Sequence, residues 1–320
     1  MATDWNDGFN QVGANGRGES VWLAQFMAMV LDMFGAICLE KGESEQGDAY
    51  YQISKKLRNA VDEHCYEQDH YIRAFYDNGR KMGSEENDEC KIDLLPQSFA
   101  VLSKMENHDR IRRALDTAYT KLVDTDKGII KLFTPAFRDS TQNPGYVKSY
   151  PAGLRENGGQ YTHASIWFAM AMLEFGEVEK AYKLITMLNP ANRYMDAELA
   201  RDYVIEPHYM AADIYTNPNA YGRGGWSLYT GAAGWYYRLV TEHLLGIRVH
   251  AGSLTLEPRL PKEWEGFSAT LFLFNTKVQI RLTQGGRDSF ELDGVKLEDE
   301  LVIPLDQKPH HVLMEVRREP

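Results

Sequence analysis

Four stretches of the chain are apolar around nearly their whole circumference when they are read as helices. Three of them are followed by a stretch whose apolar residues recur on one side only. The first pattern is typical of a helix buried in an inner layer, and the second of a half-exposed helix. Consecutive pairs therefore predict helical hairpins. The buried helices are expected at residues 20–40, 92–105, 160–175 and 227–245, and the half-exposed ones at 44–67, 109–123 and 178–188.

The buried helices begin at a spacing of roughly seventy residues, and each follows a polar, aromatic loop, called here a lead-in loop. The units share no sequence identity, so the repetition is one of architecture. We predict a mainly α fold in which the hairpins form a partial (α/α)6 toroid, with the lead-in loops converging at one pole. The longest apolar run, 21–39, contains Gln25, Asp32 and Gly35, and is expected to be a buried helix with no membrane contact.

The pattern changes after Gly246, where short β-prone segments are separated by Gly, Asp and Pro turns. This predicts a small all-β C-terminal domain. We therefore expect two domains, a helical catalytic domain at 1–246 and a β-rich domain at 247–320. The expected strands are 254–256, 269–274, 277–282, 289–292, 301–305 and 312–316.

The composition narrows the class of protein. The chain has 320 residues, of which 43% are hydrophobic and 25% charged, as in ordinary soluble globular proteins. A net charge of −11 and the lack of a basic run argue against nucleic-acid binding. The 3 cysteines are odd in number and unevenly spaced, which predicts reduced thiols and a cytoplasmic location.

Acidic and aromatic residues are concentrated in the first lead-in loop, where Asp4, Trp5 and Asp7 fall within residues 3–10. Asp, Asn and Gly favour turns, so this stretch predicts a loop. An apolar neighbour raises the pKa of a carboxyl group and lets it keep a proton to donate. Because an indole also stacks on a pyranose face, the stretch suits sugar chemistry. A polar turn beside a core tryptophan is the structural alternative.

The other three lead-in loops mix acidic, basic and aromatic side chains. Carboxylates and amides suit sugar hydroxyls, and a histidine with Arg, Thr and a backbone N–H suits an oxyanion such as phosphate. The candidates are Asp88, Glu89 and Asp93 in the second loop, Arg155, Glu156, Asn157, Gln160 and His163 in the third, and Arg223, Trp226, Tyr229, Thr230 and Gly231 in the fourth.

Each of these candidates also has a structural interpretation. His163 could be a core histidine, Arg155 with Glu156 a local salt bridge, and Thr230 with Gly231 a site of close helix packing. No His or Cys pair has metal-ligand spacing, and no Gly-x-Ser-x-Gly nucleophile motif is present. We therefore expect no metal and no cofactor.

Several motifs together resemble the C-terminal half of glycoside hydrolase family 94, the inverting sugar phosphorylases, and the resemblance covers essentially the whole chain. Within the family, the sequence motifs are most similar to those of members that act on β-1,2-linked glucans. The motifs are Asp4-Trp5-Asn6-Asp7-Gly8, Gly16-Arg17-Gly18-Glu19-Ser20-Val21-Trp22-Leu23, Gly153 to His163, Ala211-Ala212-Asp213-Ile214-Tyr215 and Gly222 to Gly231.

The resemblance implies a role for each matching residue. Asp7 would be the general acid, Trp5 would lie in the sugar site, and Arg155 near the acceptor sugar, with Glu156 and Gln160 also binding substrate. Phosphate would be held by His163, Thr230 and Gly231. The implied reaction is inverting phosphorolysis of β-glucosides, with β-1,2-linked glucooligosaccharides as the expected substrates, to α-glucose 1-phosphate. Inorganic phosphate is the nucleophile and co-substrate, so one acid suffices.

The chain also departs from the family pattern. A toroid of six hairpins has twelve helices, whereas the pattern here predicts about eight. The family's N-terminal β-sandwich and first toroid helices have no counterpart, so the chain is expected to hold half an active site. We expect weak or no turnover unless a second copy in a homodimer or a complementing N-terminal chain supplies the rest. The expected partners are thus a β-glucan oligosaccharide, phosphate and such a chain.

Two other functions remain open at this stage. An inverting hydrolase would use Asp7 as acid and Glu156 or Glu206 as the base that activates water. A non-catalytic fragment would bind glucan through its aromatic loops and β domain without cleaving it. Phosphate dependence of product formation separates the phosphorylase from the hydrolase.

Overall fold

A computed structural model describes residues 4–228, 231–298 and 301–317 of the chain. It divides into two compact units, each described here by itself. The first comprises Met1–Phe175 with Leu184–Trp235, and the second Gly176–Lys183 with Tyr236–Pro320. The division at Trp235 differs from the sequence-based boundary at 246, because the end of the last helix groups with the β-rich part.

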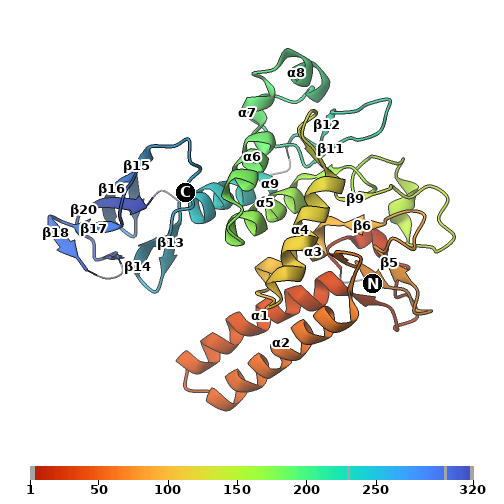
Figure 1. Ribbon diagram of the computed structural model, residues 1–320, viewed down its shortest axis with the longest axis horizontal. Helices are drawn as coiled ribbons and strands as arrows, with labels where there is room; N and C mark the ends of the chain where they lie inside the picture. The colour runs from red at the N-terminus through yellow and green to blue at the C-terminus, as the bar shows by residue number, and fades with distance from the viewer. Residues whose placement is uncertain (1–3, 229–230, 299–300, 318–320) are drawn as a thin grey trace. The chain divides into compact units, whose positions relative to one another are not determined.

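Helical hairpins form the body of the first unit, as the periodicity predicts (Figure 1). Ser20, Asp93 and Asn107 cap the first, third and fourth helices through their side-chain oxygens, which explains where these helices begin. The third helix packs against the first, fourth and fifth. The helices are α1 (Val21–Glu40), α2 (Ser44–His64), α3 (Leu94–Leu102), α4 (His108–Leu122) and α5 (Thr162–Glu174), followed by α6 (Val178–Leu188), α7 (Pro190–Arg193), α8 (Ala197–Tyr203) and α9 (Gly231–Arg238) with a π-helical turn at Leu239–Leu244.

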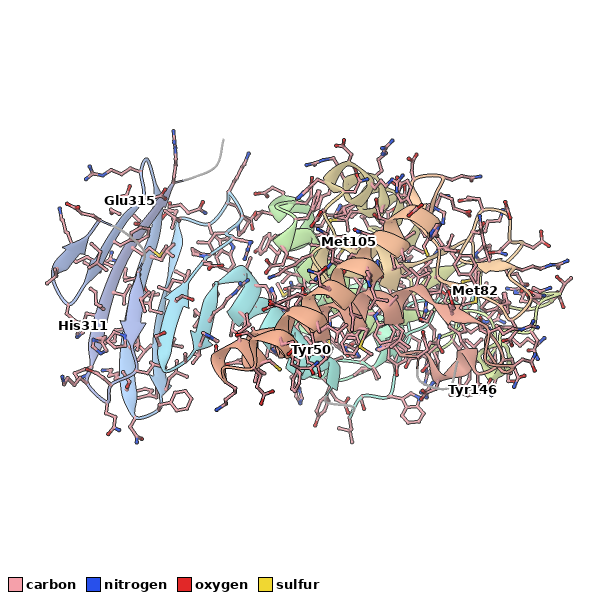
Figure 2. The ribbon with its side chains drawn as sticks, turned by 90° about the horizontal axis from the view of Figure 1, so that it is seen from below. Tyr50, Met82, Met105, Tyr146, His311 and Glu315 are labelled. Carbon is pink, nitrogen blue, oxygen red and sulfur yellow. The ribbon has the colours of Figure 1, made fainter. Side chains whose placement is uncertain are left out.

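Two of the helices that were expected to lie in an inner layer, α1 and α5, differ in how much of their surface is buried. Residues 164–173 of α5 are all buried, as expected. The prediction that α1 is buried all round is wrong, since Met33 is 64% and Phe34 50% exposed. Phe34 makes an edge contact with its neighbour on α2, Tyr50, which is labelled in Figure 2. Helix α2 covers one side of α1, and the short α3 reaches only part of another. Among the described residues, α1 is the one helix long and apolar enough to cross a membrane.

Two-residue strands precede three of the hairpin helices and tie the lead-in loops to other loops. A strand stands directly before each of α1, α3 and α5. Each pairs antiparallel with a strand from a distant loop, so the backbone of the lead-in loops is fixed by ladder hydrogen bonds. The sheets are β1 (Glu19–Ser20), β4 (Ala74–Phe75) and β5 (Lys81–Met82), then β6 (Ile92–Asp93) and β9 (Phe133–Thr134), and β10 (Gln160–Tyr161), β11 (Asp213–Ile214) and β12 (Gly224–Gly225). Two further hairpins are β2 (Tyr66–Glu67) with β3 (His70–Tyr71) and β7 (Val123–Asp124) with β8 (Ile129–Ile130).

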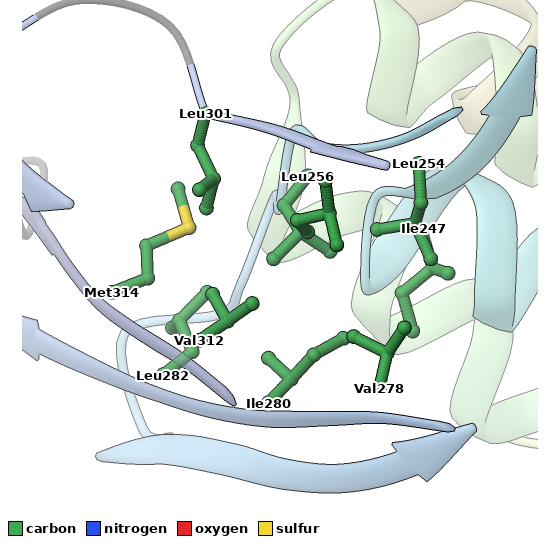
Figure 3. Packing of buried hydrophobic residues seen from close by; sticks show 10 residues of the cluster. Ile247, Leu254, Leu256, Val278, Ile280, Leu282, Leu301, Val312 and Met314 are labelled. Atoms are coloured by element: carbon green, nitrogen blue, oxygen red, sulfur yellow. The ribbon is translucent and has the colours of Figure 1, made fainter. Parts of the chain in front are cut away.

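The second unit contains two sheets that share one core, which confirms the all-β character of the C-terminal region. Buried and exposed residues alternate along β16, as the period of a strand requires. Its buried Ile280 lies opposite Val312 in the parallel pair β16/β20, and both face the smaller sheet across the core (Figure 3). The sheets are β13 (Ile247–His250), β14 (Ser253–Leu256) and β19 (Val302–Pro304), and β15 (Gly266–Leu273), β16 (Thr276–Gly285), β20 (His310–Arg317), β17 (Ser289–Leu292) and β18 (Val295–Leu297).

Candidate functional site

The first lead-in loop is anchored by a buried carboxylate. Asp4 forms an ion pair with Arg73, whose Nη1 lies 3.0 Å from Asp4 Oδ2, and both side chains are fully buried. Asp4 also accepts hydrogen bonds from the backbone N–H of Asn6 and the hydroxyl of Ser20. Burial alone would raise the pKa of Asp4, but Arg73 and these hydrogen bonds hold it below its ordinary value. Asp4 is therefore an ionised anchor for the loop.

Arg73 connects this loop to the second lead-in loop. Its Nε lies 3.3 Å from Oδ2 of Asp93, the residue that caps α3, and its guanidinium lies 5.1 Å from the centre of the Phe9 ring. Burial raises the pKa of Asp93 to about 6 although the charge of Arg73 opposes this. A single buried cation thus holds two loops that the sequence predicts at the same pole.

Asp7 opens the short helix η1 (Asp7–Phe9), and its side chain is exposed. The backbone of η1 packs against η2 (Tyr146–Ser149). A Cβ at Gly8 would lie 2.7 Å from Cβ of Val147, so only glycine allows this approach. Burial and then the charge of Asp7 raise the pKa of Tyr146, a residue of η2.

His163 lies on the first turn of α5 inside a cluster of aromatic rings. Nε1 of Trp5 donates a hydrogen bond to Nδ1 of His163 at 3.3 Å. The ring centres of Trp167 and Trp235 lie 4.0 and 5.5 Å from that of His163, and Tyr161 contacts Trp5 edge-on at 5.0 Å. Burial lowers the pKa of His163 to about 4, so the imidazole is neutral at pH 7.

This cluster joins the first lead-in loop to the helices that follow the third and fourth lead-in loops. Trp5 comes from the first loop, His163 from the helix after the third, and Trp235 from α9, which follows the fourth. Gly231 is the first residue of α9, one helical turn before Trp235. Thr230 and Tyr229, predicted beside it, lie outside the described residues. The first lead-in loop thus meets α5 and α9 at His163.

The third lead-in loop holds Arg155 in a left-handed backbone conformation with φ of 49°. Its backbone N–H donates to Oδ2 of Asp213 at 3.1 Å, and Nε lies 3.5 Å from Oε2 of Glu156. The guanidinium lies over the rings of Trp226 and Tyr150, at 4.3 and 5.4 Å from their centres. Arg155 and Glu156 therefore form a local pair, and the aromatic rings fix where the cation lies.

Gln160 has a different environment from the other predicted site residues. It is buried, its Oε1 accepts the backbone N–H of Ile130 at 2.8 Å, and Nε2 lies 3.4 Å from Oγ1 of Thr162. These contacts stabilise the start of α5. Contact of Gln160 with substrate stays a prediction.

The sequence patterns did not single out a role for Asp213. This buried residue lies on β11, opposite Tyr161 on β10 and Gly225 on β12. Burial raises its pKa to about 6 against the charge of Arg155. The available signal was a lone carboxylate in the apolar run Ala211-Ala212-Asp213-Ile214, where a charge needs a partner.

Two further observations bear on what the site can bind. Within the residues that the structure describes, no group of three or more His, Cys, Asp or Glu side chains could hold a metal ion. The large hollow of about 1040 Å³ lined by Asp32, Lys55, Arg58 and residues 104–109 contains none of the predicted site residues. The residues of the lead-in loops therefore remain the candidates for the functional site.

The chain belongs to the Glycosyl hydrolase 94 superfamily, whose catalytic domain matches residues 1–246. The C-terminal domain of Glycosyl hydrolase family 65 matches residues 247–297. The family predicted from the motifs is confirmed.

Among curated proteins, the chain is 40% identical to the cyclic beta-(1,2)-glucan synthase NdvB of Rhizobium meliloti (strain 1021), over 90% of this chain and 10% of that protein. It is 28% identical to the 3-O-beta-D-glucopyranosyl-beta-D-glucuronide phosphorylase of Paenibacillus borealis, over 83% of this chain and 34% of that protein. It is 25% identical to the 1,2-beta-oligoglucan phosphorylase of Listeria innocua serovar 6a (strain ATCC BAA-680 / CLIP 11262), over 64% of this chain and 20% of that protein. The chain thus spans about a third or less of the length of these relatives.

A solved sialidase structure shares the fold, with a TM-score of 0.53 at 11% identity over 82% of this chain and 24% of that one.

Proposed function

We propose that this chain provides the acid and phosphate side of a glycoside phosphorylase. The hairpins from α1 to α6 would form part of an (α/α)6 toroid. The reaction would be inverting phosphorolysis of β-glucosides, with β-1,2-linked glucooligosaccharides as substrates, and no cofactor besides inorganic phosphate. The linkage follows from the β-1,2-glucan relatives, two of which carry that linkage in their names.

The proposal is supported above all by the position of His163 between Trp5 of the first lead-in loop and Trp235 of α9. Trp5 bonds to His163 from a position two residues before Asp7, so the loop of the proposed acid reaches the proposed anion site. The neutral imidazole stacks on Trp235, one helical turn after Gly231, and Gly231 and Thr230 would contribute a backbone N–H and a hydroxyl to phosphate.

The proposed mechanism needs only one carboxyl group. Asp7 donates its proton to the glycosidic oxygen as the bond from that oxygen to the anomeric carbon breaks. A phosphate oxygen, held by His163, Thr230 and Gly231, forms the new bond from the opposite face and yields α-glucose 1-phosphate. The shortened oligosaccharide leaves with the proton from Asp7, which is reprotonated from solvent. Trp5, Arg155, Glu156 and Gln160 would bind the sugars.

The test joins the chain to the rest of its Listeria relative, because the match covers only 20% of that protein. Release of glucose 1-phosphate from β-1,2-glucooligosaccharides is measured with and without phosphate. We expect strict phosphate dependence and a loss of about 10²- to 10⁴-fold in Asp7→Asn. Asp48→Asn, which removes an exposed carboxylate on α2 outside the lead-in loops, is the matched control.

Two results would contradict the proposal. Glucose released at the same rate without phosphate would identify a hydrolase, with Glu156 or Glu206 as its base. Full activity in Asp7→Asn would remove the assigned acid. The chain without its complement is expected to turn over weakly or not at all.

A further inference from the structure

Trp5 contacts His163 through a directional hydrogen bond rather than through ring packing only. The indole N–H can only donate, so Nδ1 of His163 must accept and carry no proton. In a neutral imidazole the single proton then lies on Nε2. The Nε2 atom is buried, and it has no hydrogen-bond partner within the described part of the chain. The imidazole thus holds an unused donor.

The rings around His163 limit how the imidazole can turn. Trp235 is nearly parallel to it, with an interplanar angle of 24° at 5.5 Å, and Trp167 is tilted by 56° at 4.0 Å. Reversing the ring would break the bond from Trp5 and leave its indole N–H unpaired, which is unfavourable at a partly buried site. The orientation of His163 is therefore set by three tryptophans.

Trp5 is itself fixed by the residues on both sides of it. Asp4 is held by the buried guanidinium of Arg73, and the side chain of Asn6 accepts the backbone N–H of Gly8 at 3.0 Å. The indole therefore extends from a loop that buried charges and a local turn hold in place. The same loop continues directly into Asp7.

We propose that Trp5 is a positioning residue that fixes His163 as the Nε2–H tautomer, so that an N–H donor and not a lone pair faces the bound phosphate. The inference rests on the proposed phosphate site and adds to it a role for Trp5 that does not require sugar contact. The opposite tautomer would direct a nitrogen lone pair at an anion, which is repulsive. Through this bond, displacement of the acid loop also alters the phosphate site.

The tautomer can be measured in the 320-residue chain without substrate. Ring-¹⁵N-histidine labelling and long-range ¹H–¹⁵N NMR distinguish the protonated from the unprotonated ring nitrogen. Among the 9 histidines, the signals of His163 are those lost in His163→Gln. We expect a protonated Nε2 and an unprotonated Nδ1. A protonated Nδ1 in the wild-type chain would overturn the inference, whether or not any variant folds.

Trp5→Phe keeps an aromatic ring but removes the donor. We expect mixed tautomers for His163 and an affinity for inorganic phosphate that is weaker by about three- to tenfold, the worth of one hydrogen bond. Phosphate is titrated at constant ionic strength and followed through the His163 signals. Trp22→Phe is the matched control, because Trp22 is buried and its indole N–H has no partner among the described residues. Unchanged tautomer and affinity in Trp5→Phe would overturn the inference.

The two hypotheses fail separately. If wild-type His163 has the expected tautomer but phosphate leaves its signals unchanged, the role of Trp5 in fixing the tautomer is supported and the proposed phosphorylase function is contradicted. If phosphate binds while Nδ1 carries the proton, the function survives and this inference does not.

Discussion

Asp213 shows how one carboxyl group can organise the third and fourth lead-in loops. It accepts the backbone N–H of Arg155, and a Cβ at Gly225 would lie 2.7 Å from its Oδ1. Its strand lies between those of the two loops. The carboxyl group is buried beside Arg155, whose cation is held by Trp226 and Tyr150. Asp213 therefore orders the loop on which the proposed acceptor site depends.

Replacing this carboxyl group should change how stability depends on pH. The pKa of Asp213 is raised to about 6 in the folded chain from 3.8, so its contribution to stability is most favourable below pH 3.8 and is lost as pH rises through 6. Asp213→Asn lacks this dependence. Relative to wild type, its free energy of unfolding should rise by about 2 kcal/mol between pH 4 and 7. Urea unfolding at several pH values measures this difference.

The control for that series is Asp126→Asn, which removes an exposed carboxyl group of the same unit. The difference in free energy of unfolding between this variant and wild type should stay nearly constant over the same pH range. If Asp213→Asn behaves in the same way, the burial of Asp213 does not govern its ionisation.

For single residues, the sequence predicted which residues belong to the site but not which of them contact one another. The motif wording identified Asp7, His163 and Arg155 as candidates. The bond between Trp5 and His163 joins residues 158 positions apart, and no local pattern encodes such a pairing. The same holds for Arg73, whose partner Asp4 lies 69 positions away.

At the scale of elements, Arg73 is the link between the first two lead-in loops. Arg73→Met would leave the carboxyl groups of Asp4 and Asp93 buried without their cation. Breaking a buried ion pair by removing one partner costs about 3–5 kcal/mol, and we expect a loss of that size in urea unfolding. Disorder of the first lead-in loop should accompany it, visible as faster amide hydrogen exchange at Asn6 and Gly8.

Arg113→Met provides the comparison. Arg113 is 58% exposed and lies 3.7 Å from Asp69 on the surface, where ion pairs contribute about 0–1 kcal/mol. Equal losses in the two variants would show that Arg73 does not anchor the loops.

The helices themselves were predictable because their periodicity is local. Sequence reasoning placed α1, α2, α4, α5 and α6 close to their observed bounds. It was wrong about the burial of α1, because burial depends on which neighbours lie against a helix. The short strands before α1, α3 and α5 were also missed, since two residues are too few to show alternation.

At the scale of the whole chain, the helical region and the β-rich region were both predictable from the change in pattern after Gly246. The side-chain contacts within the β-rich unit were not predictable from that pattern. His310 lies between Asp293 and Asp306, with Nδ1 and Nε2 at 2.7 and 3.0 Å from their carboxylates. Burial lowers its pKa, but the two carboxylates outweigh this and hold the pKa above its ordinary value.

The β-rich unit should therefore lose stability as the solution becomes alkaline. A raised pKa of His310 contributes stability that is present below pH 6.5 and is lost as pH rises through the folded value. Amide hydrogen exchange in β16 and β20 of the whole chain should be slower at pH 6 than at pH 8 after correction for intrinsic rates. His310→Gln should remove this difference, whereas His311→Gln, an exposed neighbour, should retain it. Identical pH dependence in both variants would contradict this role of His310.

In the proposed reaction, one acid at Asp7 acts opposite a phosphate held at His163. The most direct measurement is ¹H and ³¹P NMR of the first product formed by the complemented chain from β-1,2-glucooligosaccharides and phosphate. We expect α-glucose 1-phosphate, identified by its anomeric proton coupled to phosphorus, with loss of one inorganic phosphate for each molecule formed. Formation of β-glucose 1-phosphate, or of free glucose with phosphate unconsumed, would contradict it.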